Sequence, residues 1–316
     1  MDERQIDEIK GEMQLIETHI SWVLLGEYVY KIKKPVKFSF LDFSTLEKRK
    51  HFCEEEVRLN RRLSPDVYLG VVPIAKNAKN GGITLEGKGK AIGYAVKMKR
   101  LENKMDDLLR QGKVTASQVT EIAAIVAGFH QKIESVQGGS PELVRKQIAD
   151  LRNHKETIGK ACGLGEKVDA VVSPCERFIE KNRGLMEKRI AEGKVKDCHG
   201  DLHSANIFIG RKIRIIDGIE FSTDFRYVDV ASEIAFMAMD LDAFRKEELS
   251  KLFVDEYIRR TGDDELRSLL PLYKCYRANV RAKIAAIDYS QHPGEEPKER
   301  MRRYLALAER YAALLV

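Results

Sequence analysis

The chain has 316 residues, of which 43% are hydrophobic and 33% are charged, and its formal net charge is +6 at pH 7. This length is close to the size at which one hydrophobic core divides, so we expect one large domain or two lobes. No apolar run approaches the roughly 18 residues of a membrane span, and the basic residues are dispersed, which argues against a membrane protein and against specific nucleic-acid binding. The sequence leaves the oligomeric state open.

The N-terminal residues and the cysteines both bear on the cellular compartment. Residues 1–17 are acidic and polar and lack the apolar core of a secretion signal. The five cysteines are scattered and form no C-x-x-C pair, which predicts reduced thiols and argues against a disulfide framework or a thiolate zinc finger. Together these features predict a cytoplasmic protein.

Residues 14–33 hold two apolar, β-branched segments separated at Leu25-Gly26-Glu27, a pattern that predicts a β-hairpin. Lys31 is then a polar residue on the second strand. Residues 67–75 and 82–101 also have the composition of strands.

Residues 45–63 place apolar side chains at helical spacing, which predicts one long helix. Ser44, followed three positions later by Glu47, has the spacing of a capping box at the start of that helix. The first hundred residues are therefore expected to form a mostly β lobe with a single long helix.

The rest of the chain is mostly helical in pattern. Thr115 or Ser117 can cap the first long helix, and residues 140–195 predict further helices with a break at Ser173-Pro174-Cys175. Two short strands are expected within residues 206–217, followed by helices up to the C-terminus.

These elements predict an α+β protein with a small β-rich N-terminal lobe and a large helical C-terminal lobe. The first lobe is expected to span residues 1–96, and a hinge is expected at residues 97–101. The helical lobe, which carries the stretch with the most polar chemistry, is expected to span residues 102–316.

That stretch is "HGDLHSANIF", in which Asn206 follows Asp201 by five positions. A further carboxylate, Asp217, comes just after the second predicted strand. Phosphoryl transfer from ATP needs such groups, because a base orients the acceptor hydroxyl and two oxygen ligands hold Mg²⁺ against the phosphates. The spacing matches the kinase pattern H-R-D-x-x-x-x-N, with Gly200 in place of the arginine.

The segment after Asp217 bears on the type of acceptor. Only residues 218–228 separate Asp217 from Asp229, which is too short for a long phosphorylatable activation segment, and no A-P-E triplet follows. This favours a small-molecule hydroxyl as the acceptor over a protein. Asp229 is expected to brace the catalytic loop through hydrogen bonds.

The motifs "HGDLHSANIF", "IIDGIEF" and "YVDVASEIAFM" resemble those of the aminoglycoside phosphotransferase family, the small-molecule branch of the protein-kinase-like fold. "ETHISWVLLGEYVYKIKKPV", "FLDFSTLEKRKHFCEEEVRLNRRL" and "YLGVVPI" further resemble an uncharacterised subgroup that is often fused to a nucleotide-binding domain. The resemblance covers about residues 14–290. It implies a kinase-like fold, with ATP as the phosphate donor and Mg²⁺ as the metal.

The resemblance also implies roles for particular residues. Asp201 orients the acceptor hydroxyl, and Asn206 and Asp217 are metal ligands. Lys31 contacts the ATP phosphates, and Glu56 is the helix glutamate that pairs with it.

Neighbouring residues remain alternatives for this pair. Lys33 lies on the same face of the strand as Lys31, so the pattern does not separate them, and Glu55 is the alternative to Glu56. A lysine held by a glutamate is useful in either case, because ordering a free lysine side chain costs up to about 2 kcal/mol.

The nucleotide is expected to meet two further segments. "ETHISW", where a kinase has its glycine-rich loop, contains no glycine, so backbone amides assisted by Ser21 or His19 are the candidates for phosphate contact. In the connecting segment, Lys97 and Met98 are expected to present backbone groups to adenine and to pack on the ring.

Four residues are candidates for substrate contact. Arg277 and Arg281 lie four positions apart and share a helix face, which suits an anionic group on the acceptor, although a solvated basic face is the simpler interpretation. His203 is either part of the loop structure or a substrate contact, and Glu220 is a candidate to assist the metal. His199 is expected to hold the turn by bonding backbone.

Two other functional classes fit parts of the pattern. A nucleotide-binding pseudokinase or interaction module is suggested by the missing glycine loop, and ATP binding without turnover would identify it. A metal-dependent hydrolase would use Cys198, His199, Asp201 and His203 as ligands, and zinc dependence would identify it.

Overall fold

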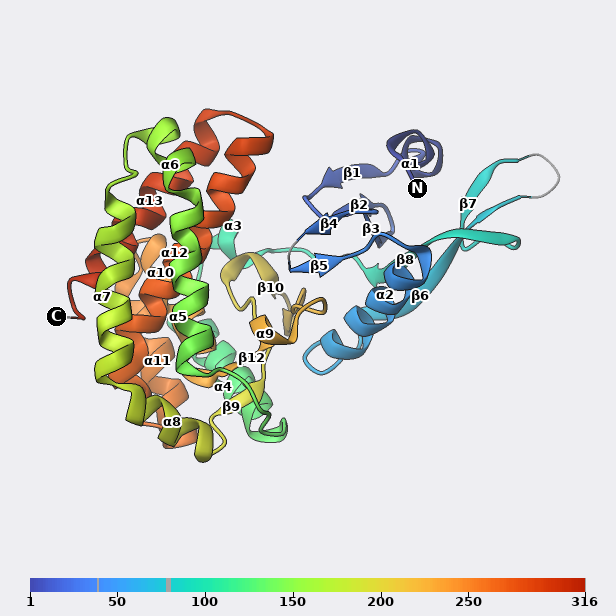
Figure 1. Ribbon diagram of the computed structural model, residues 1–316. Coiled ribbons are helices and arrows are strands. Elements are labelled where there is room, and N and C mark those ends of the chain that lie inside the picture. The colour runs from blue at the N-terminus through green and yellow to red at the C-terminus, as the bar shows by residue number, and fades with distance from the viewer. Residues whose placement is uncertain (39, 78–80, 316) are drawn as a thin grey trace. The chain divides into compact units, whose positions relative to one another are not determined.

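The computed structural model describes residues 1–38, 40–77 and 81–315. The chain divides into two compact units, whose elements are labelled in Figure 1. Unit 1 comprises Met1–Lys104 and Asn206–Thr223, and unit 2 comprises Met105–Ala205 and Asp224–Val316. The predicted division at residues 97–101 assigned residues 206–223 to the helical lobe, whereas the structure groups them with the β-rich unit.

Unit 1 is built on an antiparallel sheet whose strands, within the described residues, follow the order β1-β2-β3-β8-β6-β7. These strands are β1 (Gln14–Glu17), β2 (Ser21–Leu25), β3 (Tyr28–Lys33), β6 (Tyr68–Lys76), β7 (Ile83–Leu85) and β8 (Lys90–Lys99). Two short antiparallel pairs accompany the sheet, β4 (Lys37–Phe38) with β5 (Leu41–Asp42) and β10 (Ile207–Ile209) with β11 (Ile213–Ile215). The predicted hairpin is confirmed, because β2 pairs with β3.

The two faces of this sheet are covered by different helices. Trp22 and Ile32 lie on one face and pack with Ile6 and Ile9 of α1 (Glu3–Lys10) in one apolar cluster. Lys31 and Lys33 point to the opposite face, since side chains alternate along a strand. That face is covered by α2 (Leu46–Asn60), which contacts β8 and β6.

The long helix predicted over residues 45–63 is confirmed as α2, but its cap differs from the prediction. Thr45 is the N-cap, and its side chain accepts a hydrogen bond from the backbone N–H of Lys48. Ser44 instead donates its hydroxyl to Asp42 at 2.5 Å. The predicted cap was therefore one position too early. Ser44 and Thr45 are both favourable N-cap residues, and the local sequence does not distinguish between two adjacent candidates.

Residues 206–223 belong to unit 1 because hydrogen bonds tie the β10–β11 hairpin to the end of α2. The hydroxyl of Ser64 donates to the carbonyl of Ile215 at 2.8 Å and accepts from its N–H at 3.1 Å. Farther along, the side-chain oxygen of Asn60 accepts from the N–H of Gly218 at 2.7 Å.

Unit 2 is helical. Its larger helices are α4 (Ala116–Lys132), α5 (Pro141–Ala149), α7 (Lys167–Lys181), α8 (Arg183–Ala191), α10 (Val230–Ala243), α11 (Glu247–Thr261), α12 (Leu266–Gln291) and α13 (Glu295–Ala312). The shorter elements are α3 (Met105–Arg110), α6 (Lys155–Cys162), α9 (Thr223–Arg226), the strand pair β9 (Val195–Asp197) and β12 (Tyr227–Asp229), and the 3₁₀ turns at Asp150–His154 and Ser204–Asn206.

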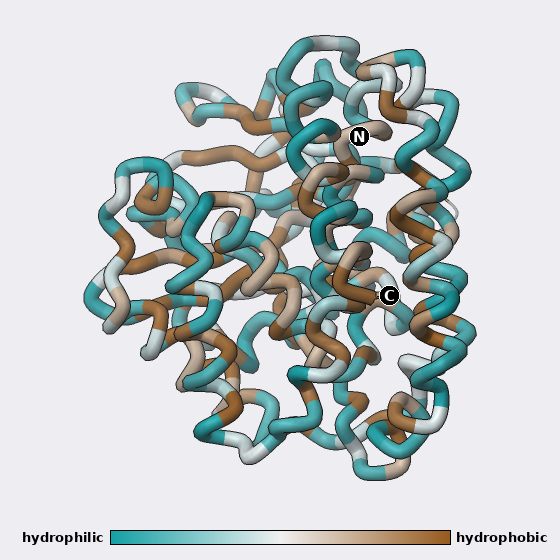
Figure 2. Tube along the Cα trace, turned by 90° about the vertical axis from the view of Figure 1, so that its left-hand side faces the viewer, coloured by the Kyte–Doolittle hydropathy of each residue, from teal (hydrophilic) through white to brown (hydrophobic). Residues whose placement is uncertain are grey.

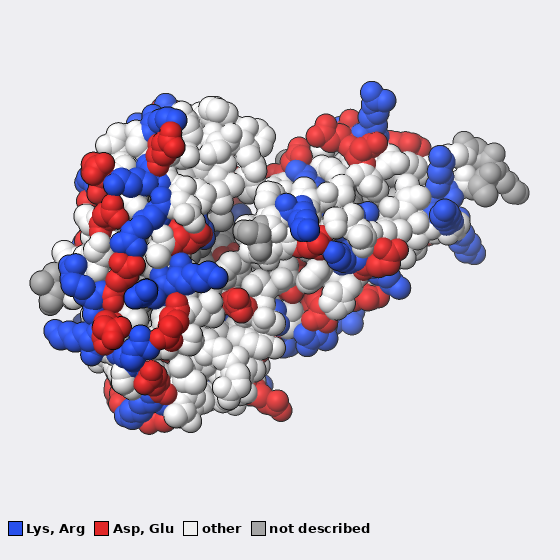
Figure 3. All heavy atoms as spheres, viewed as in Figure 1, with Lys and Arg blue, Asp and Glu red and all other residues white. Residues whose placement is uncertain are grey.

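Helix α10 is the centre of unit 2, because every residue from Val230 to Asp242 is buried. Helices α11 and α12 both contact it, and α13 packs against α12 and α7. Figure 2 shows apolar and polar stretches alternating along the chain, which is the pattern of helices with one buried face. On the face drawn in Figure 3, basic and acidic side chains are interspersed over the helical unit.

The cap of α4 and the course of α7 test two predictions made from the sequence. Thr115 caps α4 in a capping box with Gln118, as one of the two predicted caps. The predicted break at Ser173-Pro174-Cys175 is wrong, because α7 continues through Pro174. The buried apolar face of α7 offsets the one backbone hydrogen bond that proline removes. In the described part of the chain, no helix is both long and apolar enough to cross a bilayer.

Candidate active site

Asp201 lies in the loop between β9 and the 3₁₀ turn at Ser204–Asn206, with 36% of its side chain exposed. His203 Nε2 lies 3.3 Å from Asp201 Oδ2. Desolvation acts to raise the pKa of Asp201, but His203, Arg281 and His199 together hold that pKa below its usual range. The side chain is therefore a carboxylate at neutral pH, the form that accepts a hydrogen bond from a hydroxyl group.

Both histidines of the motif stabilise this loop. His199 Nδ1 accepts a hydrogen bond from the backbone N–H of Asp201 at 3.2 Å, so its predicted role in holding the turn is confirmed. His203 Nδ1 accepts from the N–H of Ala205 at 3.2 Å. Because Nδ1 of His203 is an acceptor, the imidazole proton is on Nε2, and this N–H points to Asp201.

The peptide groups that precede Asp201 are held from two helices. Glu233 of α10 accepts from the N–H of His199 at 3.0 Å and from the N–H of Gly200 at 2.6 Å. Arg277 of α12 donates to the carbonyl of Gly200 at 3.0 Å. Gly200 has a φ of 86°, a conformation in which a side chain would be strained. These contacts fix the direction in which the loop presents Asp201.

Asp229 does not brace this loop in the way that the sequence suggested. Its carboxylate accepts two hydrogen bonds from Arg189 at 2.8 Å and one from the N–H of Ala231, so it caps α10. Arg189 is fully buried and also binds Asp263 at 2.7 Å. Glu233 braces the catalytic loop instead, because it lies one helical turn farther along α10.

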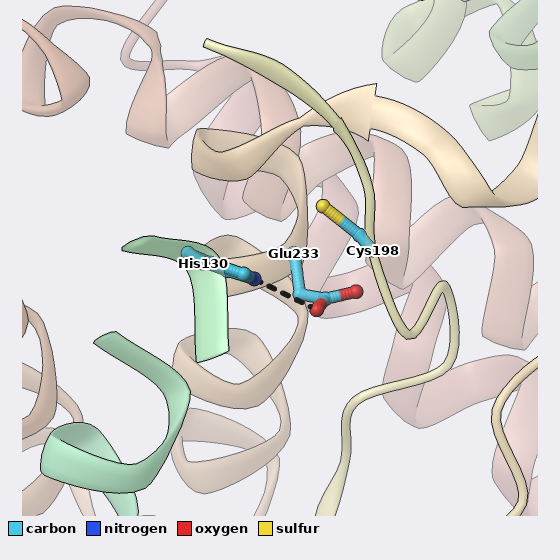
Figure 4. Close-up of side chains that lie close together, drawn as sticks. All are labelled: His130, Cys198 and Glu233. Atoms are coloured by element: carbon cyan, nitrogen blue, oxygen red, sulfur yellow. Dashed lines mark hydrogen bonds and ion pairs between the residues drawn. The ribbon is translucent and has the colours of Figure 1, made fainter. Parts of the chain in front are cut away.

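Glu233 is held in turn by His130, as Figure 4 shows. His130 Nε2 lies 3.0 Å from Glu233 Oε1, and His130 Nδ1 lies 2.8 Å from the hydroxyl of Tyr257. Burial acts to raise the pKa of Glu233, but His130, His199 and the N–H of Gly200 lower it to about 2. A buried carboxylate is thus kept ionised in order to bind two backbone N–H groups.

Glu233→Gln is expected to destabilise the protein by about 1–3 kcal/mol, because the amide NH₂ would face a buried N–H donor. Since the pKa of Glu233 is lowered from 4.5 to about 2, its ionised form stabilises the fold above pH 4.5, and that contribution is lost as the pH falls toward 2. Urea unfolding at several pH values should therefore show a difference between parent and variant that shrinks below pH 4.5. Glu248→Gln, at an exposed position, is the control; a difference independent of pH would contradict this role.

The metal-hydrolase interpretation gains little support. Within the described residues, His130, Cys198 and Glu233 are the one group of three potential ligands whose ligand atoms lie within 4.8 Å of one another, and they are drawn in Figure 4. Asp201 and His203 are not among them. Burial raises the pKa of the Cys198 thiol well above its usual value, which opposes the thiolate form that a metal would need.

In unit 1, Lys31 and Lys33 of β3 both contact Glu56 of α2. Lys31 Nζ lies 3.0 Å from Glu56 Oε1, and Lys33 Nζ lies 2.7 Å from Glu56 Oε2. Glu55, the sequence alternative, instead pairs with Arg58 at the surface. Burial acts to raise the pKa of Glu56, but the two lysines lower it to about 2.

The surroundings of the two lysines differ. Lys31 also pairs with Asp217. Lys33 pairs with Glu220, and neither the side chain of Lys33 nor that of Glu56 is exposed. Burial raises the pKa of Glu220, whose side chain is only 4% exposed. The predicted role of Glu220 at the metal is therefore not supported, because its carboxylate is buried against Lys33.

Asn206 and Asp217 lie at the two ends of the β10–β11 hairpin. Ile207 pairs with Ile215 in the hairpin register, and the N–H of Ile216 donates to the carbonyl of Asn206 at 2.9 Å. The hairpin therefore brings the two predicted metal ligands to adjacent positions. Both side chains carry oxygen atoms that can act as ligands, and oxygen ligands suit Mg²⁺.

The segment that begins at Asp217 is anchored by two residues that the sequence did not single out. The N–H of Asp217 donates to the hydroxyl of Tyr68 at 3.0 Å, and the N–H of Gly218 donates to Asn60. Asp217 has a φ of 65°, which is uncommon for aspartate. Asn60 lies one helical turn after Glu56, and this spacing in the sequence could have indicated that both residues share the face of α2 that meets the Asp217 segment.

The glycine-free segment that leads into β2 contains Ser21, one of the predicted phosphate contacts. Ser21 is buried on the same face as Lys33, with which it pairs across β2 and β3, and its N–H donates to the hydroxyl of Thr18 at 3.0 Å. The glycine-free segment is thus a tight turn closed by Thr18. The side chain of Ser21 has no hydrogen-bond partner among the described residues.

Of the predicted hinge at residues 97–101, residues 97–99 are the end of strand β8. Lys97 and Met98 lie inside β8, whose backbone pairs with β3 on one side and β6 on the other. Lys97 binds Glu86 at 2.7 Å, and Met98 is buried in the apolar core. The residues after β8, from Arg100 to Asn103, instead border a cavity of about 820 Å³. Its other lining residues are Asp66, Phe208, Gly210, Arg211, Lys212 and Arg214.

The two arginines of α12 have different positions. Arg277 is 3% exposed and donates to the backbone carbonyls of Gly200 and Ser232, so its predicted contact with substrate is replaced by a role in bracing the loop. Arg281 is half-buried, and its Nη1 lies 3.4 Å from His203 Nε2.

Comparisons of sequence find relatives in mycobacteria. No protein-family model matches this chain. Curated relatives, all described as uncharacterised proteins, occur in Mycobacterium bovis and Mycobacterium tuberculosis and are 30% identical over 301 residues. The match covers 92% of this chain, which spans 58% of the length of those relatives.

Comparisons of structure show the fold. A choline kinase from Cryptosporidium parvum superimposes with a TM-score of 0.53 and 14% identity, over 94% of this chain and 88% of that one. A thermostable mutant of aminoglycoside phosphotransferase APH(4)-Ia gives 0.52 and 12% in its apo form, over 96% and 98% of the two chains. A ternary complex of such a mutant with AMP-PNP and hygromycin B gives 0.50 and 12%, over 96% and 97%. The predicted α+β, protein-kinase-like fold is confirmed.

Proposed function

We propose that this protein transfers the γ-phosphate of ATP, with Mg²⁺, to a hydroxyl group of a small molecule. The observation that carries the proposal is an ionised Asp201 in a braced loop, followed in the chain by a hairpin that brings Asn206 and Asp217 to adjacent positions. The protein-kinase-like fold supports it, as do fold neighbours that include a choline kinase and an aminoglycoside phosphotransferase with bound AMP-PNP.

The reaction needs few groups from the protein. The acceptor hydroxyl oxygen attacks the γ-phosphorus, the bond from that phosphorus to the bridging oxygen of the β-phosphate breaks, and ADP leaves. Asp201 orients the hydroxyl and takes up its proton. A carboxylate with a lowered pKa is a weak base, so its main contribution is orientation of the nucleophile.

The proposed phosphate-binding groups lie in unit 1. Asn206 and Asp217 would hold Mg²⁺, which when bound offsets the negative charge of the phosphates. Lys31, ordered by Glu56, would contact phosphate oxygens after leaving Asp217. We assign the contact with the adenine edge to the backbone of residues 100–102, which follow β8 and line the cavity, in place of Lys97 and Met98.

The short segment after Asp217 supports a small acceptor. Residues 218–228 contain the anchored Gly218, the buried Glu220 and the short elements α9 and β12, and they include no long loop on which a protein substrate could dock. The acceptor in this proposal is therefore a small hydroxylated molecule.

A nucleotide-binding pseudokinase is the second candidate. The observation that favours it is the ion pair between Lys31 and Asp217, which occupies a proposed metal ligand. The tight turn closed by Thr18, in a segment without glycine, points in the same direction. In this case the protein would bind nucleotide but not transfer phosphate.

The proposal is tested by measuring ADP release from Mg²⁺-ATP by the purified protein, alone and with pools of hydroxylated metabolites. Turnover that requires Mg²⁺ and increases with one pool is the expected result. Nucleotide binding without turnover in any pool would favour the pseudokinase. Tightly bound zinc without nucleotide binding would favour the hydrolase.

A further inference from the structure

Two hydrogen-bond donors lie beside Asp201 in unit 2. Arg281 extends from α12 so that its Nη1 is 3.4 Å from His203 Nε2, and His203 Nε2 is 3.3 Å from the Asp201 carboxylate. The Arg281 guanidinium also packs on the ring of Tyr304, with 5.3 Å between Cζ and the ring centroid. Tyr304 is buried, so it supports the arginine from behind.

Arg281 and His203 cannot form a hydrogen bond with each other. His203 Nδ1 accepts the N–H of Ala205, so Nε2 carries the proton, and a guanidinium has donors only. Two donors at 3.4 Å form no hydrogen bond with each other. The acceptor of His203 Nε2 is the Asp201 carboxylate, and His203 therefore offers no acceptor to Arg281 Nη1.

No carboxylate pairs with Arg281 at 4.0 Å or less in the described part of the chain, in contrast to Lys274 and Lys283 on the same helix. Lys274 binds Asp242 at 2.9 Å, and Lys283 binds Asp150 at 2.8 Å. The nearby carboxylate of Asp240 is already bound to the N–H and hydroxyl of Ser204. The Arg281 guanidinium is thus available to an anion from outside the chain.

We infer that the phosphate acceptor is itself an anion, with a carboxylate or phosphate group that Arg281 binds while its hydroxyl meets Asp201, the carboxylate that His203 contacts. This inference rests on the proposed phosphotransferase function. Arg281 can bind a carboxylate or phosphate through two parallel N–H groups, which adds direction as well as charge. The same positive charge repels an acceptor that carries an ammonium group.

The test compares three sets of hydroxylated probes in the Mg²⁺-ATP assay: sugar phosphates with glycerate, neutral polyols, and choline with ethanolamine. An anionic probe is expected to accelerate ADP release. Arg281→Gln should raise the KM for that probe by about 10- to 100-fold, with the KM for ATP unchanged, because one charged hydrogen-bonding group is lost. Arg281→Lys should restore part of this loss, since the charge returns without the two-pronged geometry.

Arg303→Gln is the matched control. Arg303 also packs on Tyr304, with 4.9 Å between Cζ and the ring centroid, but it is exposed. A thermal-shift measurement with the same anions and Mg²⁺-AMP-PNP provides a readout that needs no turnover, and stabilisation of the parent but not of Arg281→Gln is expected.

The outcomes separate the inference from the function on which it rests. Turnover with choline or with a neutral polyol, unchanged in Arg281→Gln, would overturn the anionic acceptor and leave the phosphotransferase intact. Equal responses of parent and Arg281→Gln to every anion, in turnover and in thermal shift, would also overturn it. Absence of ATP turnover, together with anion stabilisation that depends on Arg281, would count against the phosphotransferase alone.

Discussion

Asp201→Asn is expected to lower kcat for phosphoryl transfer by about 10²- to 10⁴-fold, because the group that orients the acceptor hydroxyl and takes its proton is lost. Binding of Mg²⁺-ATP should change little, since the proposed phosphate and metal contacts lie at Lys31, Asn206 and Asp217. Initial rates of ADP release and calorimetric titration with Mg²⁺-AMP-PNP measure the two effects separately.

The control for Asp201→Asn is Asp224→Asn, which removes an exposed carboxylate from α9. It should retain parental turnover. The folded state should survive in both variants, because the loop remains held by Glu233 and Arg277 at Gly200. Parental kcat in Asp201→Asn would exclude this residue from the reaction, whatever the binding data show.

Asp217→Asn is expected to weaken Mg²⁺-dependent nucleotide binding by roughly 10- to 100-fold, the range that losses around a metal ligand commonly produce. Asparagine keeps one oxygen donor but removes the negative charge that attracts the cation. The apparent affinity for Mg²⁺, measured by titrating the metal at fixed AMP-PNP, is the quantity to compare.

The Asp217→Asn variant also loses the ion pair with Lys31, so a second change is needed to interpret it. Asp7→Asn removes another carboxylate of unit 1, one that binds Lys10 at 2.7 Å, and it should leave the Mg²⁺ affinity unchanged. If Asp217→Asn showed the same Mg²⁺ dependence as the parent, Asp217 would have no part in holding the metal, and the pseudokinase would gain weight.

Several features could be predicted because they depend on short stretches of chain. The hairpin of β2 and β3, the helix α2 and the cap at Thr115 follow from periodicity and from turn and cap residues. The apolar residues that recur at helical spacing in α13 are buried. They are Met301, Tyr304, Leu305, Ala308 and Tyr311. The spacing of Asp201, Asn206 and Asp217 likewise identified two features of the structure: the loop held by Glu233 and Arg277, and the β10–β11 hairpin.

Other features depended on partners far apart in the sequence. Glu56 rather than Glu55 meets Lys31 because α2 turns that side of the helix toward β3. Residues 97–99 lie in a strand because β3 and β6 pair with β8 on its two sides. Local pattern contains neither the direction of a helix face nor the number of neighbours of a strand.

The sequence by itself led to the proposed chemistry, because a carboxylate, a carboxamide and a second carboxylate at these spacings suit phosphoryl transfer. Only the tertiary structure separated the two arginines of α12, which one helical turn places in different surroundings. Arg277 is buried against the carbonyl of Gly200, and Arg281 reaches His203 beside Asp201. Spacing along a helix establishes that two side chains share a face, but burial by other helices decides which of them can meet a substrate.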